Sequence, residues 1–143
     1  MSVNSVSLHR VLAAPPEKVF RAFSDPAAMA SWLPPYGFIC VVHQMDFKVK
    51  GTYKMSFTNF STGNGHSFGG QYLEIAENKF LKYTDKFDDP HLPGEMVTTV
   101  SFEQVICGTE LKIVQEGIPA MIPVEMCYLG WQESLDKLKR LVE

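Results

Sequence analysis

Residues 52–87 read TYKMSFTNFSTGNGHSFGGQYLEIAENKFLKYTDKF, and their pattern is the clearest indication of the fold. Apolar and polar side chains alternate in three runs, residues 52–60, 66–75 and 80–87, as expected of strands with one buried face. One loop rich in Gly and Asn and one tight turn separate the runs. Because such short connections join sequential antiparallel strands, the stretch predicts an antiparallel unit of three strands.

Similar patterns continue on both sides of this unit. Residues 38–47 precede it, and residues 95–105 and 109–116 follow it, so six strands are expected after residue 37. Residues 5–12 alternate in the same way and predict a seventh strand at the N-terminus.

Two short helices are expected between the first strand and the others. Pro16 suits the first turn of a helix, where its missing N–H is no loss, and Val19, Phe20 and Phe23 then share one side. Ser24-Asp25-Pro26 interrupts this helix, and a second one is predicted over residues 27–32.

The hydrophobic period changes to 3.6 after Pro123 and predicts an amphipathic helix of about 20 residues, roughly 30 Å long. Its more apolar stripe contains Cys127, Trp131, Leu135, Leu138 and Val142, and we expect Trp131 to pack the helix against the sheet. The opposite face is expected to be a solvated surface of mixed charge that contains Glu133, Asp136, Lys137 and Arg140.

This order of elements predicts the α+β class, with a curved antiparallel sheet of six to seven strands around the long C-terminal helix. Only that helix is long enough to cover the apolar face of the sheet. We expect residues 1–143 to form one domain, because 143 residues suit a single core. A strongly curved sheet does not close fully on one helix, so an apolar cavity is expected between them.

Composition excludes several classes of protein. Hydrophobic residues make up 45% and charged residues 20% of the chain, which is typical of a folded domain and not of a disordered one. The net charge of −3 provides no basic field for nucleic acid. No membrane span or signal peptide is recognised, and Cys40, Cys107 and Cys127 are expected to be reduced, buried thiols. A cytoplasmic protein, monomeric or homodimeric, is therefore predicted.

Several motifs together resemble one known family, the activator of heat-shock protein 90 ATPase homologues. The resemblance spans nearly the whole chain and rests on WLPPYGF (32–38), MDFKVKGTY (45–53), GQYLEI (70–75), LKYT (81–84), GTEL (108–111) and GWQESLDKL (130–138). One departure is that Lys50-Gly51 stands where the family commonly has paired glycines.

The resemblance implies a helix-grip fold of the START-like, birch-pollen-allergen-like group, which includes lipid carriers, aromatase/cyclases and allergens. Members of this group share shape far more than chemistry. Eukaryotic co-chaperones of the family carry an additional N-terminal domain, for which this chain is expected to have no room. The resemblance therefore implies a ligand-binding domain more than a chaperone activator.

Aromatic and Met side chains are expected to form the wall of the cavity. Thioether and aromatic surfaces adapt to irregular apolar ligands, and Tyr hydroxyls can orient a polar head group. Tyr53, Tyr72 and Tyr83 are the candidates for that orientation. The predicted ligand-binding residues are Met29, Trp32, Phe38, Tyr53, Met55, Phe57, Tyr72, Tyr83, Asp85, Phe87 and Met126.

Polar motifs give weaker signals. Alternation places Asp85 on the same face as Tyr83, at the expected rim of the cavity, whereas Asp88-Asp89-Pro90 has ordinary turn composition. The four histidines, His9, His43, His66 and His91, lack the spacing of metal ligands and are expected on the surface or in loops. No metal, other cofactor or catalytic residue is therefore predicted.

Three functions remain open at this point. The first is binding, without chemistry, of a small hydrophobic or amphipathic molecule such as a lipid, a polyketide-like or an aromatic compound. The second is a cyclase- or dehydratase-type enzyme in which Tyr83, Asp85 or Tyr53 moves a proton. The third is a co-chaperone-like interaction domain with a chaperone as its partner.

Overall fold

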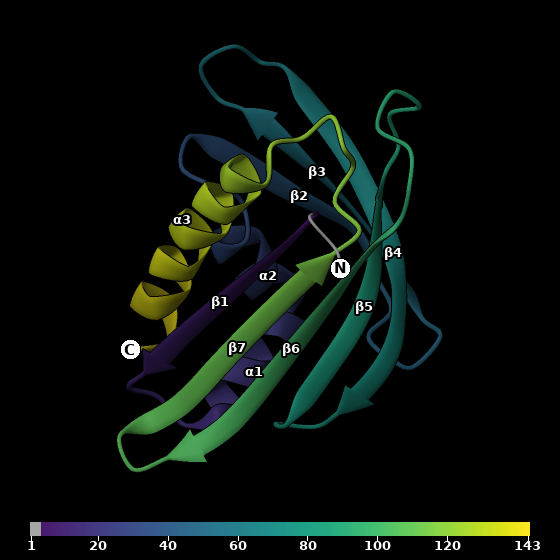
Figure 1. The fold of residues 1–143 in the computed structure, drawn as a ribbon. Coiled ribbons are helices and arrows are strands. Elements are labelled where there is room, and N and C mark those ends of the chain that lie inside the picture. Colours follow the sequence, from purple (N-terminus) through teal and green to yellow (C-terminus); the bar gives the residue numbers. More distant parts are fainter. Residues whose placement is uncertain (1–3) are drawn as a thin grey trace.

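A computed structural model describes residues 4–143 (Figure 1). Its elements are β1 (Ser5–Leu12), α1 (Pro16–Ser24), α2 (Pro26–Trp32), β2 (Phe38–Met45), β3 (Thr52–Asn59), β4 (Gly65–Ala76), β5 (Phe80–Phe87), β6 (Met96–Val105), β7 (Gly108–Glu116) and α3 (Val124–Val142). The seven strands form one antiparallel sheet in the order β1-β7-β6-β5-β4-β3-β2. The predicted α+β fold, with two short helices after β1 and a long C-terminal helix, is confirmed.

The sheet curves around α3, which crosses its concave side, while α1 and α2 lie at one end of that side (Figure 1). Strands β1 and β2 form the two opposite edges of the sheet although only the two short helices separate them in the chain. The C-terminal half of α3 packs near β1, α1 and α2. Two hydrogen bonds hold it there: Glu143 accepts from the N–H of Ala13, just after β1 (2.9 Å), and Ser134 donates to the carbonyl of Leu33, just after α2 (2.5 Å).

The short helices begin where the sequence signals place them. Pro16 occupies the first turn of α1, whose apolar side buries Val19 and Phe23 completely. The side chain of Asp25 then caps α2, since its Oδ1 accepts hydrogen bonds from the N–H groups of Ala27 (2.9 Å) and Ala28 (3.2 Å). This cap explains why the chain can bend between the two helices and still satisfy its backbone.

The turn before β3 shows how the chain accommodates its departure from the family pattern. Lys50 adopts a left-handed conformation with φ of 71°, which a glycine takes at lower cost. Gly51 is required there, because a Cβ atom would lie 2.0 Å from the Asp46 carbonyl oxygen. The predicted strand over residues 38–47 ends earlier, at Met45, because the chain already turns at Asp46 and Lys48.

One surface prediction is wrong and another is incomplete. Cys107 was expected to be buried, but it is exposed in the tight turn between β6 and β7. The charged face expected on α3 does reach solvent, but three of its four residues also hold the loop before β2: Glu133 accepts from the Tyr36 N–H (3.0 Å), Asp136 from the Tyr36 hydroxyl, and Lys137 donates to the Pro34 carbonyl (2.8 Å). Charge pattern alone could not reveal this loop contact.

Candidate functional site

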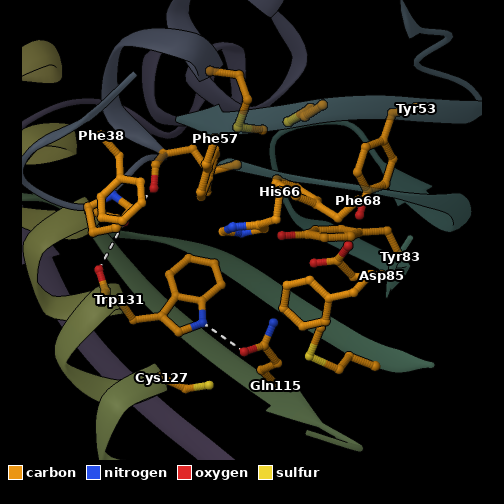
Figure 2. A pocket seen from close by; sticks show the side chains of 18 of the residues that line it. Phe38, Tyr53, Phe57, His66, Phe68, Tyr83, Asp85, Gln115, Cys127 and Trp131 are labelled. Carbon is orange, nitrogen blue, oxygen red and sulfur yellow. Dashed lines mark hydrogen bonds between the residues drawn. The ribbon is translucent and has the colours of Figure 1, made fainter. Parts of the chain in front are cut away.

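A cavity of about 320 Å³ lies between the N-terminal half of α3 and strands β3 to β7 (Figure 2). It forms because α1 and α2 fill the space under the helix only at the other end. The register of β3 against β4 pairs Met55 with Phe68 and Phe57 with His66, so both strands direct alternate side chains to the cavity. Its lining residues are Phe23, Met29, Leu33, Pro35, Phe38, Tyr53, Met55, Phe57, His66, Phe68, Tyr72, Leu81, Tyr83, Asp85, Phe87, Met96, Gln115, Ile122, Met126, Cys127, Gly130, Trp131 and Ser134.

Ten of the eleven predicted site residues line this cavity: Met29, Phe38, Tyr53, Met55, Phe57, Tyr72, Tyr83, Asp85, Phe87 and Met126. Trp32 is the exception. Its side chain is completely buried between the short helices, where Nε1 donates to the Ala22 carbonyl (2.8 Å) and the indole meets the Phe23 ring edge-on at 4.8 Å. The last turn of α2 therefore aims Trp32 at α1 and away from the cavity.

Three tyrosine rings meet on the cavity wall. Their ring centroids lie 5.5 Å apart for Tyr53 and Tyr72, 5.9 Å for Tyr53 and Tyr83, and 6.2 Å for Tyr72 and Tyr83. Burial raises the pKa of all three phenols far above the ordinary value, so their hydroxyls stay neutral at physiological pH. The Tyr53 hydroxyl donates its proton to the Thr84 carbonyl (2.8 Å), which fixes the ring beside Asp85.

Asp85 is the one carboxyl group among the described cavity residues. The sequence suggested the rim, but Asp85 Oδ1 is shielded from solvent and lacks a hydrogen-bond partner among residues 4–143. Burial raises the pKa of this carboxyl group to about 7, and the nearby Tyr53 hydroxyl and Lys86 backbone N–H oppose that rise only in part. Asp85 can therefore change its charge near neutral pH, inside an otherwise apolar wall.

His66 is a cavity residue that sequence reasoning missed. It lies in β4, and its ring points into the cavity between Phe57 (5.8 Å between centroids) and Phe87 (5.6 Å) (Figure 2). Burial lowers its pKa, which favours the neutral imidazole. His66 is two residues before Phe68, so alternation along the strand would have placed it on the cavity face. It was overlooked because it lies at the start of β4, next to the loop before that strand.

Trp131 combines the predicted packing role with a polar one. Its indole is 9% exposed and lines the cavity from α3, while Nε1 donates to Oε1 of Gln115 on β7 (3.1 Å). Gln115 in turn donates to the Thr98 hydroxyl on β6 (3.3 Å). This chain of hydrogen bonds links the helix to the sheet and satisfies the polar groups of Trp131 and Gln115 that face the cavity.

The geometry favours neither a metal centre nor a membrane span. Within residues 4–143, no three His, Cys, Asp or Glu side chains gather in a way that could hold a metal ion. Across the same residues, no helix is sufficiently long and apolar to cross a membrane. Cys127 lines the cavity half-buried, and Cys40 is buried near Lys137 with the pKa of its thiol raised to about 11 by burial.

Comparison with known proteins places the chain in a family. Residues 13–143 match the model of the family described as Activator of Hsp90 ATPase homolog 1-like protein. The chain belongs to this family. No curated protein matches the chain. The family resemblance of the sequence motifs is thereby confirmed over nearly the whole length.

Solved structures of other family-like proteins share the fold. A protein from Chromobacterium violaceum is 56% identical, with a TM-score of 0.97 over 98% of this chain and 97% of its own. A Rhodobacter sphaeroides protein is 20% identical (TM-score 0.84, 98% and 92% covered), and an AHSA1-like protein from Aeromonas hydrophila is 20% identical (TM-score 0.78, 95% and 90% covered). The last two establish likeness of fold alone.

Proposed function

We propose that this member of the Activator of Hsp90 ATPase homolog 1-like family binds a small hydrophobic or amphipathic molecule in the cavity under α3. The observation that carries the proposal is the cavity itself, whose volume of about 320 Å³ falls within the size range of small-molecule sites. A core that existed only for stability would gain by closing such a space, since empty volume costs packing energy.

The chemistry of the wall supports the same function. Most lining side chains are aromatic or aliphatic, and Met29, Met55, Met96 and Met126 add flexible thioethers that adapt to irregular shapes. A few polar groups converge on the space, namely the tyrosine hydroxyls, Asp85 and His66. An apolar wall with a few convergent polar groups is typical of a site that binds a ligand by burying its apolar surface and orients that ligand by hydrogen bonds.

Native mass spectrometry of the purified protein is the first test, followed by thermal-shift measurements with fatty acids, flavonoids and polyketide-like aromatics. A molecule that binds the native state raises the melting temperature as its concentration increases. A bound mass or such a shift supports the proposal. Absence of both, across this panel and across apolar amines of similar size, contradicts it.

A pair of variants on α3 locates the binding. Gly130 lines the cavity, and a Cβ atom there meets nothing within 4 Å, so the ring in Gly130→Phe has room to enter the cavity. Leu129 is the matched control, because it is 55% exposed on the same helix and does not line the cavity. Gly130→Phe is expected to abolish the ligand-induced shift, and Leu129→Phe to keep it.

An enzyme of the cyclase or dehydratase type is the second candidate, and Asp85 is the observation that favours it. A carboxyl group with a pKa of about 7 can act as a general acid or base at neutral pH. Such an enzyme would lose turnover in Asp85→Asn while still binding its substrate. A pure binding domain would show no turnover in either form.

A chaperone partner remains an expectation drawn from the family description. If no ligand is found, a binding assay with purified heat-shock protein 90 is the next experiment. Saturable binding there would favour an interaction domain over a ligand carrier.

A further inference from the structure

If the cavity binds a ligand, as proposed above, Asp85 indicates the charge of that ligand. The described residues that line the cavity include one carboxyl group, that of Asp85, and no lysine or arginine. A ligand carboxylate or phosphate would therefore find no cationic side chain there. Partial burial lowers the pKa of His66, which favours its neutral imidazole over a cation.

A hydrogen-bond acceptor without a donor, by contrast, is present in the cavity wall. Oδ1 of Asp85 is buried without a hydrogen-bond partner among the described residues. The Tyr53 hydroxyl, which lies beside this carboxyl group, donates to the Thr84 carbonyl oxygen at 2.8 Å. A buried polar atom left unpaired costs free energy, and a bound donor would recover that cost.

Aromatic faces surround the same carboxyl group. Tyr53 and Tyr83 converge on Asp85 in the cavity (Figure 2), and Tyr72 packs against both rings at 5.5 and 6.2 Å. Aromatic faces attract cations through the negative charge of their π systems. A carboxylate beside aromatic rings thus suits a cation that carries hydrogen-bond donors.

We propose that the cavity selects an apolar molecule that carries a protonated amine, whose N–H group donates to Oδ1 of Asp85 beside the tyrosine rings. The apolar body of the ligand fills the space between Trp131, Phe57 and Phe68. The volume of about 320 Å³ is at the lower end for ligand sites, so this body has the size of one or two aromatic rings. Anionic amphiphiles such as fatty acids are disfavoured by the absence of a cation from the described wall.

The test uses three probes with one shared ring system: 2-(2-naphthyl)ethylamine, 2-(2-naphthyl)ethanol and 2-naphthylacetate. Their affinities are measured by isothermal titration calorimetry at pH 8, where Asp85 is ionised and an alkylamine is still protonated. The amine is expected to bind at least about tenfold tighter than the alcohol, because a buried hydrogen bond between charged groups is strong. The carboxylate is expected to bind more weakly than the alcohol.

Two variants assign the preference to one side chain. In Asp85→Asn the amine is expected to lose its advantage and to bind within about threefold of the alcohol. Asp89→Asn is the matched control, because it removes the same charge from an exposed turn and keeps the oxygen that accepts the His91 N–H. This control should retain the wild-type ratio of affinities.

The outcomes separate this inference from the function on which it rests. Equal affinity of amine and alcohol in the wild type, or tighter binding of the carboxylate, overturns the amine proposal but leaves ligand binding in place. An amine preference that survives in Asp85→Asn also overturns it. Failure of all three probes to bind overturns the amine proposal, and it overturns the proposed function as well only if the purified protein also carries no bound mass and shows no thermal shift across the panel. If Asp85→Asn does not fold, the affinities of the wild-type protein for the amine, the alcohol and the carboxylate still test the amine proposal.

Discussion

Toward its C-terminus α3 packs against β1 and the two short helices through Leu135 and Leu138, whereas toward its N-terminus it faces the cavity through Cys127, Gly130 and Trp131. We call the first region the closed end and the second the open end. Both use the same helix and the same sheet. The difference is that α1 and α2 fill the closed end and no element fills the open end.

In this helix-grip fold, a filled core and a cavity thus lie along a single helix. At the closed end, side chains are fully buried and meet one another directly. At the open end, aromatic and Met side chains line an empty space, and titratable groups are tolerated there. Each prediction below tests whether the two ends respond differently to a similar change.

The largest effect is expected from Leu138→Ala at the closed end. Leu138 is fully buried, so its truncation should lower the free energy of unfolding by about 3 kcal/mol through lost burial and a new cavity. The matched change at the open end, Met126→Ala, removes a side chain that is 64% exposed and should cost less than about 0.5 kcal/mol. Urea denaturation measures both. Equal losses would contradict the distinction between the ends.

The second prediction concerns the pH dependence of stability. Because the pKa of Asp85 is raised to about 7 in the folded state, folded protein binds more protons than unfolded protein between about pH 4 and pH 7. Stability should therefore fall as pH rises through that window, and Asp85→Asn should remove this fall.

The free energy of unfolding of Asp85→Asn minus that of wild type should change by on the order of 2 kcal/mol between about pH 4 and pH 7. Access of water to the cavity keeps this change below the value that the pKa shift alone would give. Thermal denaturation at pH 4.5 and pH 8 measures it. Asp89→Asn, which removes the same charge from an exposed turn, serves as the control. A difference that does not vary with pH would show that Asp85 titrates normally.

The third prediction adds a methyl group at each end. Gly130→Ala should raise the free energy of unfolding by about 1 kcal/mol, because alanine favours the helix and its Cβ has open space. Ala22→Val at the closed end should instead lower stability by about 1 kcal/mol, since Ala22 is only 4% exposed in a filled core. Opposite signs in denaturant titrations would confirm the comparison, and equal signs would contradict it.

The smallest effect is expected at the turn that leads into β3 beside the open end. Lys50→Gly should increase stability by about 0.5 kcal/mol, because glycine adopts a φ of 71° without the strain that lysine bears. The nearby exposed Lys48 lies outside the left-handed region, so Lys48→Gly should give no gain. Melting temperatures of the two variants check the difference.

Much of the fold followed from local pattern. Alternation in residues 52–60 and 80–87 placed Tyr53, Met55 and Tyr83 on the cavity side, because side chains of a strand point to opposite faces in turn. No such rule was available for Trp32, which lies in a helix of about two turns whose orientation depends on its contacts with α1. Short helices lack a period long enough to show which side is buried.

Contacts between distant segments could not be predicted in the same way. Tyr36 meets Glu133 and Asp136 across about a hundred residues of chain, so no local pattern reports the pairing. Cys107 has apolar neighbours in sequence but occupies a tight turn that projects into solvent. In each case exposure depends on which other segment is present, and that is a property of the folded chain.

The sequence by itself determined the order of elements, the antiparallel pairing and the side chains available to form a wall, because these depend on periods of 2 and 3.6 and on turn residues. The folded structure was needed to show that the short helices pack toward one end, that a cavity remains at the other, and that Oδ1 of Asp85 is shielded there without a hydrogen-bond partner among residues 4–143. The reason is that volume and desolvation are set by all the surrounding elements together, whereas local pattern describes one element at a time.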